Sequence, residues 1–303
     1  PFYFRDNQRR VTRWTFFGGN LAGVKEKLDY LQELGITIIY FNPIFEAASN
    51  HKYDTADYLK IDGMFGDEEI FRELVAEAKK RGISIILDGV FSHTGCDSIY
   101  FNRFGHFPGQ GAYQSPDSPY AKWYTFTDAC CREYACWWGV DDLPNVNEME
   151  PSYRDFIYRS ENSVVGHWMR TGVKGWRLDV ADELPDEFIK ELRQHLKAID
   201  PEAVLIGEVW EDASHKISYG KLREYLWGEE LDSTMNYPLR EILLDFLLAK
   251  KDAGLTHKRI MSLYENYPRE NFFAAMNLIG SHDRERVLTL LGEAPDGQTL
   301  TER

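Results

Sequence analysis

Carboxylates stand at the ends of apolar, β-branched runs in this sequence. Asp88, Asp179 and Glu208 each close such a run, and Asp283 follows a further one. Burying a charged group is costly unless the group is paired, so carboxylates at these positions need an explanation. An ionised carboxylate beside a protonated carboxylic acid is the pair of groups that hydrolyses glycosidic bonds. The pattern therefore indicates acid/base chemistry on a sugar.

Strand geometry predicts how these groups are held. Side chains two positions apart share a face of a strand, so Arg177 and Asp179 point the same way. We expect the guanidinium of Arg177 to lower the pKa of Asp179, because a neighbouring cation favours the ionised carboxylate. Crowding by Asp179 and Asp283 should raise the pKa of Glu208, so that Glu208 keeps the proton that a general acid needs. At any single position, a structural ion pair or a helix cap is the alternative.

The elements that carry these residues alternate between two hydrophobic periods. Apolar runs typical of strands lie at 36–41, 83–88, 173–180, 203–209, 233–237 and 272–278, and the first of them is expected to be buried. Helical periodicity covers 21–34 as one apolar face, a stretch after the N-cap Asp67, residues 188–196, and about 239–250 and 257–266. This alternation predicts an α/β fold with a parallel sheet. In a parallel barrel, the carboxyl ends of the strands gather on one rim, where active sites lie.

Residues 96–150 interrupt this alternation. They are rich in aromatic residues, Pro, Gly and Asp, and they show no sustained period. A loop of this length within a compact protein is a functional excursion or a small subdomain. We therefore expect 1–95 to be the first part of a catalytic barrel, 96–150 an inserted subdomain, and 151–303 the second part.

Composition limits the partners and the location. The net charge of −14 argues against nucleic acid, because a phosphate-binding surface is basic. No apolar run approaches the ~20 residues that span a membrane, and Pro1–Arg5 is not a secretory signal. The four cysteines form no CxxC pair with a nearby His, so we expect reduced thiols, no metal site and a cytoplasmic protein. They are Cys96, Cys130, Cys131 and Cys136.

Four segments, in order along the chain, resemble the signature segments of the α-amylase family of glycoside hydrolases. They are Asp88–His93, Gly175–Asp179, Gly207–Trp210 and Asn277–Asp283. Further segments resemble the neopullulanase, cyclomaltodextrinase and maltogenic amylase branch, and they lie at 17–21, 42–45, 51–58 and 235–238. The resemblance implies a (β/α)8 TIM-barrel type of fold, with the insert after the third family strand.

Carried over position by position, the resemblance implies roles for the matching residues. Asp179 would be the nucleophile, Glu208 the general acid/base, and Asp283 the carboxylate that stabilises an oxocarbenium-like transition state. Asp88 would be a structural partner. Four residues would bind the sugar, the first by stacking under its ring and the others by hydrogen bonds: Tyr53, His93, Arg177 and His282.

The resemblance also implies a substrate class. We expect retaining hydrolysis of α-1,4-glucosidic bonds in maltooligosaccharides, cyclodextrins or pullulan, without a cofactor. The alternatives are an α-1,6-glucosidase or a trehalose-forming isomerase on the same scaffold, or an inactive carbohydrate-binding relative. Such a relative should lack one of the three carboxylates, and all three are present. Assembly into a homo-oligomer stays open.

This sequence departs from the family pattern at several places. Ser92 stands where many α-amylases have an Asn that helps to bind calcium, so we expect no calcium there. Asn145 replaces a usual Lys and Glu211 a frequent His, which leaves the substrate preference open. Four aromatic residues of the insert could line a sugar groove or form a subdomain core: Trp123, Tyr124, Trp137 and Trp138.

The six expected strands correspond to the second through seventh of the family barrel. We therefore expect the chain to be a piece of a longer barrel that lacks the first and last strands and the flanking β-sandwich domains. The open sheet edges of such a piece must be covered or paired by another chain. On this basis we expect weak activity at best, or completion of the sheet by a partner molecule.

Overall fold

The computed structural model describes residues 4–5, 11–13, 18–127 and 133–292. The chain forms two compact units. The first unit comprises Pro1–Asp179 with Glu183–Val204, and the second comprises Val180–Asp182 with Leu205–Arg303. Cys96 and Cys136 are free thiols. Cys130, Cys131 and Phe17, which the sequence patterns above include, lie outside the described residues.

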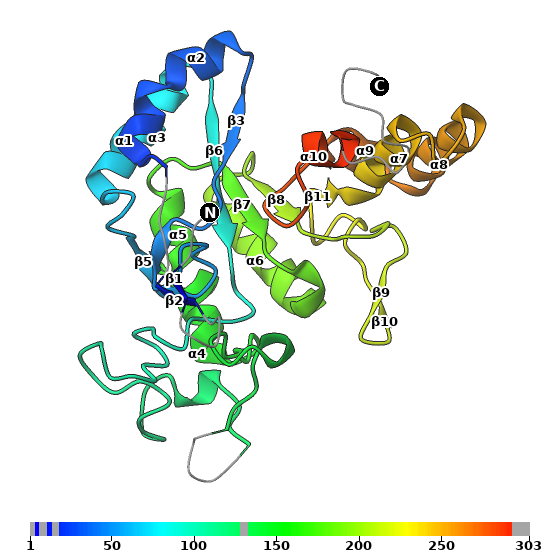
Figure 1. Cartoon of the computed structure of the whole chain (residues 1–303). Coiled ribbons are helices and arrows are strands. Elements are labelled where there is room, and N and C mark those ends of the chain that lie inside the picture. Colours follow the sequence, from blue (N-terminus) through cyan, green and yellow to red (C-terminus); the bar gives the residue numbers. More distant parts are fainter. Residues whose placement is uncertain (1–3, 6–10, 14–17, 128–132, 293–303) are drawn as a thin grey trace. The chain divides into compact units, whose positions relative to one another are not determined.

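Parallel strands alternate with helices along the described chain (Figure 1). The strand order is β12-β11-β8-β7-β6-β3. These strands are β3 (Ile38–Tyr40), β6 (Ser84–Gly89), β7 (Gly175–Leu178), β8 (Val204–Gly207), β11 (Ser233–Asn236) and β12 (Met276–Asn277). The helices between them are α3 (Glu68–Lys80), α4 (Pro151–Arg154), η3 (Asp155–Arg159), α5 (Val164–Met169), α6 (Asp186–Ile199), α7 (Tyr237–Leu247), α8 (Ala253–Asn266) and α9 (Arg269–Phe273). The predicted alternation of six strands with helices is confirmed.

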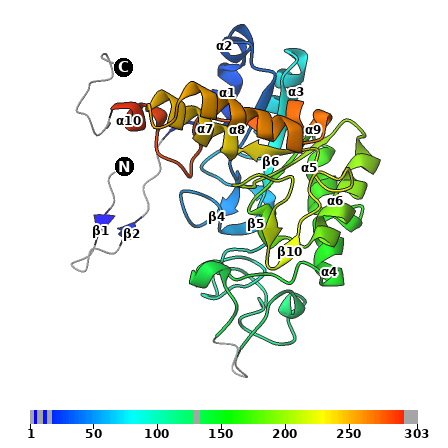
Figure 2. The same ribbon diagram turned by 90° about the vertical axis from the view of Figure 1, so that its right-hand side faces the viewer.

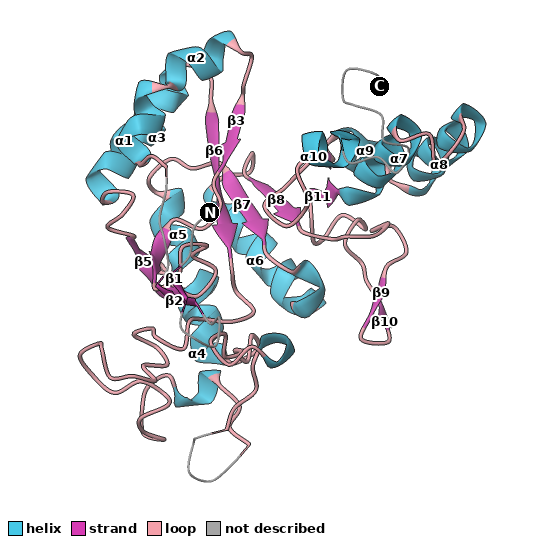
Figure 3. Ribbon diagram, in the orientation of Figure 1, coloured by secondary structure: helices cyan, strands magenta, loops and turns pink. Residues whose placement is uncertain are grey.

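Further elements of the described part of the chain join these strands and helices (Figure 3). Three antiparallel hairpins pair β1 (Phe4–Arg5) with β2 (Val11–Arg13), β4 (Phe45–Ala47) with β5 (Thr55–Ile61), and β9 (Ile217–Ser218) with β10 (Lys221–Leu222). The remaining helices are α1 (Leu21–Glu26), α2 (Leu28–Glu33), η1 (Ala121–Trp123), η2 (Trp137–Gly139), η4 (Ala181–Glu183) and α10 (Val287–Gly292). The hairpins were not predicted, because most of their strands are too short to show a hydrophobic period.

In the first unit, β3, β6 and β7 pair in parallel, and their register places Asp88 opposite Arg177. Gly175 begins β7 with φ +153°, and a Cβ there would lie 2.1 Å from the carbonyl oxygen of Val204. Only glycine fits this close approach of two strands. The packing behind β7 is aromatic, because the buried ring of Trp176 lies 5.6 Å from Phe91. The strand ends that carry the candidate residues are thus supported by buried aromatic side chains.

The N-terminal part of the first unit departs from expectation in two places. The helix expected over 21–34 is broken at Lys27 into α1 and α2, and Leu34 is 62% exposed at its end. The run 36–41 is not buried, because Ile38 is 49% exposed. Within the described residues, β3 pairs with β6 alone and therefore lies at an edge of the sheet. An apolar run does not distinguish an edge strand from a central one. The expected N-cap is confirmed, since Asp67 Oδ1 accepts from the amide of Ile70.

The predicted insert holds together through aromatic contacts and isolated bridges. Trp123 is 3% exposed and Tyr124 is 6% exposed, so both belong to a core. Trp137 and Trp138 stack with their ring centroids 5.3 Å apart, and Trp138 is 78% exposed. The bridge between His93 and Asn145 ties the insert to the segment after β6. The groove alternative is therefore wrong for Trp123 and Tyr124, and the division at 96–150 stays a prediction.

In the second unit, β8, β11 and β12 pair in parallel, with Thr234 opposite Gly207 and Met235 opposite Met276. Helices α7, α8 and α9 pack against one another in sequence (Figure 2). The strand expected over 272–278 is shorter than predicted. Phe272 and Phe273 belong to α9 instead, because Glu270 and the preceding Pro268 begin a helical turn there. No helix in the described part of the chain is long and apolar enough to cross a membrane.

Candidate active site

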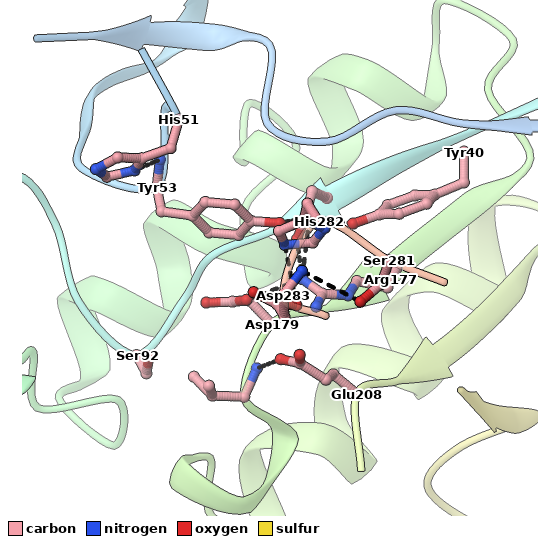
Figure 4. Close-up of polar contacts among 12 residues, drawn as sticks. Tyr40, His51, Tyr53, Ser92, Arg177, Asp179, Glu208, Ser281, His282 and Asp283 are labelled. Atoms are coloured by element: carbon pink, nitrogen blue, oxygen red, sulfur yellow. Dashed lines mark hydrogen bonds and ion pairs between the residues drawn. The ribbon is translucent and has the colours of Figure 1, made fainter. Parts of the chain in front are cut away.

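Arg177 lies beside Asp179 at the carboxyl end of the first unit's strands (Figure 4). Its Nη1 atom lies 2.8 Å from Asp179 Oδ1, and 2.8 and 3.0 Å from the two carboxylate oxygens of Asp88. All three side chains are buried. The contact with Asp179 follows from the i, i+2 alternation of β7, and the contact with Asp88 follows from the register between β6 and β7. One cation therefore compensates two buried anions.

Two tyrosine hydroxyls complete the environment of Asp88. Tyr53 donates to Asp88 Oδ2 over 2.9 Å, and Tyr40 donates to the same oxygen. Burial, and then the negative charge of Asp88, raise the pKa of both tyrosines. Both hydroxyls therefore stay protonated and act as donors. Tyr40 had no predicted role, and no local signal marks it, because its partner lies 48 residues away.

His93 lies beside Tyr53 with both ring nitrogens engaged. Nε2 lies 3.1 Å from the carbonyl oxygen of Tyr53, and Nδ1 lies 3.0 Å from Ser92 Oγ. A carbonyl only accepts, so the hydrogen-bond network assigns the proton to Nε2 and makes Nδ1 the acceptor. Burial lowers the pKa of His93 to about 4. The imidazole is therefore neutral near pH 7, and its expected sugar contact stays a prediction.

In the second unit, Glu208 is held by two donors. Its Oε2 atom accepts from the backbone amide of Val180 over 2.8 Å, and Oε1 accepts from Trp210 Nε1 over 3.1 Å. The side chain is buried, with 4% of its surface exposed. Both carboxyl oxygens thus have fixed directions, which is what a group that transfers protons needs.

Aromatic rings link Glu208 to Asp283. Trp210 stacks on Tyr237 with centroids 4.8 Å apart, and the hydroxyl of Tyr237 lies 3.5 Å from Asp283 Oδ2. His282 Nε2 lies 3.2 Å from the same Asp283 oxygen. Trp210 and Tyr237 fell within recognised motifs but had no predicted role. Their contact depends on two strands far apart in sequence.

The two clusters therefore contain the residues singled out from the sequence. In the first unit, Tyr53 and Arg177 contact Asp88, while Asp179 joins through Arg177 and His93 through Tyr53. In the second unit, Glu208 contacts Trp210, Asp283 contacts Tyr237, and His282 joins through Asp283. Among the described residues, no group of three or more His, Cys, Asp or Glu side chains is arranged to hold a metal ion. The expectation about calcium at Ser92 stays a prediction.

Comparison with known proteins identifies the family. Residues 1–301 match the family described as "Alpha amylase, catalytic domain". The chain belongs to this family. The resemblance seen in the four signature segments is thereby confirmed, and with it the (β/α)8 barrel type of fold, of which the described residues supply six parallel strands.

Three proteins of known name are similar to this chain. An amylopullulanase from Thermoanaerobacterium saccharolyticum is 43% identical over 306 residues, which cover 91% of this chain and 23% of the relative. A cyclomaltodextrinase from Geobacillus thermopakistaniensis (strain MAS1) is 38% identical over 289 residues, covering 93% of this chain and 46% of the relative. The solved cyclic alpha-maltosyl-(1→6)-maltose hydrolase from Arthrobacter globiformis, in complex with maltose, superposes with a TM-score of 0.82 at 33% identity, covering 92% of this chain and 61% of the hydrolase.

These relatives confirm the expected branch, since a cyclomaltodextrinase is among them. This chain spans less than half the length of each of these two curated relatives.

Proposed function

We propose that this protein hydrolyses α-1,4-glucosidic bonds in maltooligosaccharides, cyclodextrins or pullulan, with retention of anomeric configuration. The observation that carries the proposal is the buried ion pair of Arg177 and Asp179 at the end of β7. A carboxylate held in this way is suited to attack an anomeric carbon. The names of the amylopullulanase and cyclomaltodextrinase relatives support the α-glucan substrate.

Two carboxyl groups perform the proposed reaction. In the first step, the Asp179 carboxylate forms a bond to the anomeric carbon while Glu208 gives its proton to the departing glycosidic oxygen. In the second step, Glu208 takes a proton from water, the water oxygen bonds to the anomeric carbon, and Asp179 leaves. Asp283 stabilises the positive charge that develops on the sugar ring.

The remaining predicted residues bind the sugar in this proposal. Tyr53 stacks beneath the ring at the cleavage site, and Arg177, His93 and His282 donate hydrogen bonds to hydroxyl groups. The neutral Nε2–H tautomer of His93 supports a donor role, because that proton already points at an oxygen, the carbonyl of Tyr53. A sugar hydroxyl would replace this carbonyl as the acceptor of the His93 Nε2 proton.

Product analysis tests the proposal. The protein is incubated separately with maltotriose, isomaltose, α-cyclodextrin and pullulan, and the products are separated by anion-exchange chromatography. We expect glucose and maltose from maltotriose, linear maltooligosaccharides from cyclodextrin, and no product from isomaltose. Absence of turnover on all four, with oligosaccharide binding retained, would point to a carbohydrate-binding relative and overturn the proposal.

Cleavage of α-1,6 bonds is the second candidate activity. It is favoured by the structural match to a hydrolase whose name specifies a maltosyl-(1→6)-maltose substrate. Release of glucose from isomaltose would select it over α-1,4 hydrolysis. Formation of trehalose from maltose would instead identify an isomerase.

Location and assembly remain part of the proposal. We propose a cytoplasmic protein, which the free thiols of Cys96 and Cys136 support because disulfides are rare in a reducing compartment. Cell fractionation tests the location. Light scattering of the purified protein tests whether copies of the chain associate.

A further inference from the structure

The backbone bends sharply just after the predicted nucleophile. Val180 has a φ of +37°, in the left-handed region that β-branched residues avoid. Such strain persists only where the surroundings enforce it, and it is concentrated at functional sites. The bend turns the Val180 amide onto Glu208 Oε2, 2.8 Å away, and the next amide, of Ala181, donates to the Glu208 carbonyl over 3.2 Å. The strained turn therefore donates hydrogen bonds to both the side chain and the backbone carbonyl of Glu208.

Asp182, the next residue of this turn, is held by three side chains. Tyr225 donates its hydroxyl to Asp182 Oδ1 over 2.6 Å, and Lys216 Nζ lies 3.0 Å from Oδ2. Arg223 donates to the carbonyl oxygens of Asp182, over 2.9 Å, and of Ala181, over 3.4 Å. All three partners flank the β9–β10 hairpin (Figure 1). The carboxylate and the backbone of Asp182 therefore join that hairpin to the turn.

The partners of Asp182 are more deeply buried than Asp182 itself, whose side chain is 27% exposed. Tyr225 is fully buried, Arg223 is 5% exposed, and the side chain of Lys216 is 14% exposed. The guanidinium of Arg223 lies 4.7 Å from the centre of the Tyr225 ring. Burial raises the pKa of Tyr225, so its hydroxyl remains a donor. Hydrogen bonds that involve an ionised group are roughly twice as strong as neutral ones, and they suit an anchor that must oppose backbone strain.

We propose that Asp182 is a positioning residue for proton transfer. By fastening the turn to Lys216 and Tyr225, it keeps the strained Val180 amide on Glu208 Oε2. Glu208 is thereby held in the orientation from which it protonates the departing oxygen. The inference rests on the proposed function, in which Glu208 is the general acid.

Leaving-group dependence separates this role from a general structural one. Breaking the glycosidic bond of maltotriose needs a proton on the leaving oxygen, whereas fluoride leaves α-maltosyl fluoride without one. In Asp182→Ala, we expect kcat/KM on maltotriose to fall by at least about tenfold, because general acid catalysis contributes about 100-fold or more. On α-maltosyl fluoride, kcat/KM should change by less than about threefold.

Three further variants refine the test. Asp182→Asn keeps an oxygen acceptor for Tyr225 and should recover part of the lost activity on maltotriose. Asp212→Ala is the matched control, because Asp212 is also a partly buried acid of this unit but contacts Ser214 and Asn266 rather than the turn. It should leave both substrates unaffected. If Asp182→Ala does not fold, Tyr225→Phe provides the same comparison of substrates.

The outcomes are distinct. An equal loss on both substrates, or no loss on either, would overturn the role of Asp182 while leaving the proposed function intact. Inactivity of the unmodified protein on both substrates would refute the proposed function itself, and the positioning role with it.

Discussion

Among single residues, Arg177 compensates two buried carboxylates of the first unit. It is buried between Asp88 and Asp179, and Asp88 also accepts from Tyr40 and Tyr53. Breaking a buried ion pair by removing a charge usually costs more than the pair contributes, because the partner stays buried. Substitutions here must therefore keep the shape and hydrogen bonding of the original side chain if activity is to be separated from folding.

Asp179→Asn meets that requirement. The amide keeps an oxygen acceptor for Arg177 but is a far weaker nucleophile than a carboxylate. We expect the rate of maltotriose hydrolysis to fall by roughly 1,000-fold or more, with the melting temperature nearly unchanged. The control is Asp252→Asn, since Asp252 caps α8 and Asn caps a helix equally well. Comparable activity in the two variants would show that Asp179 is not the nucleophile.

His93 makes stability depend on pH. Its pKa is about 4 in the folded protein, below the ordinary value of 6.5, so the folded state binds fewer protons between these values. Stability is therefore fully present above pH 6.5 and is lost as the pH falls toward 4. The difference corresponds to about 3 kcal/mol.

Urea unfolding at pH 7 and at pH 4 measures this effect. The free energy of unfolding should fall by about 3 kcal/mol more in the unmodified protein than in His93→Gln, which lacks the titrating ring. The difference between the two proteins removes the contribution of the carboxylates that also titrate in this pH range. Parallel losses in both would contradict the assignment of a neutral, buried imidazole.

The sequence allowed some residue contacts to be predicted and hid others. Arg177 and Asp179 are two positions apart on one strand, so alternation alone predicted their contact. The contacts of Glu208 with Val180, and of Tyr40 with Asp88, join residues 28 and 48 positions apart. Such pairs depend on register and on a turn conformation that no local period encodes.

Among the elements, the longest and most periodic were the most predictable. Strands β6, β7, β8 and β11 and helices α3, α6, α7 and α8 lie close to their expected places, since each has an apolar side that is buried. The break at Lys27 and the hairpin of β4 and β5 were missed, because tertiary contacts decide them. That hairpin matters to the site, since Tyr53 lies between its strands.

A buried ion pair fixes the loop of this hairpin. Lys52 Nζ lies 2.6 Å from Asp62 Oδ2, with side chains 3% and 8% exposed. Lys52 also donates to the carbonyl of Ala47, and it precedes Tyr53 directly. We expect Lys52→Met to destabilise the protein by about 3–5 kcal/mol, because Asp62 is left buried without its cation. Chemical denaturation measures the change.

The same hairpin supplies the control. Lys60 forms an ion pair of equal length with Glu46, but its side chain is 59% exposed. Lys60→Met should therefore change stability by less than about 1 kcal/mol. Equal effects of the two substitutions would mean that burial does not determine the contribution of these pairs.

For the whole molecule, the proposed reaction determines the stereochemistry of the product. Attack by Asp179 followed by attack of water inverts the anomeric carbon twice, so the first product is the α-anomer. Proton NMR during the first minutes of cyclodextrin or maltotriose hydrolysis should show the α-anomeric signal before mutarotation. Early appearance of the β-anomer would indicate a single displacement and remove the nucleophilic role of Asp179.

At this scale the sequence predicted the fold class through repeated strand and helix periods, and the family through four motifs in order. It did not predict the division into two compact units, which separates Asp179 from Val180 although they are adjacent in the chain. Such a division depends on which parts of the chain contact one another most closely. This is a property of tertiary packing rather than of any local sequence pattern.

The stacked pair of Trp137 and Trp138 gives the protein a built-in optical probe. Trp138 is the most exposed of the described tryptophans, and its indole Nε1 donates to Glu183 Oε1 over 3.1 Å. The net charge of −14 and this adjacent carboxylate repel iodide but not neutral acrylamide. Acrylamide should therefore quench its fluorescence far more than iodide does. Binding of an oligosaccharide over this ring should shift the tryptophan emission to shorter wavelength and reduce its quenching by acrylamide. The binding could therefore be followed without an added label.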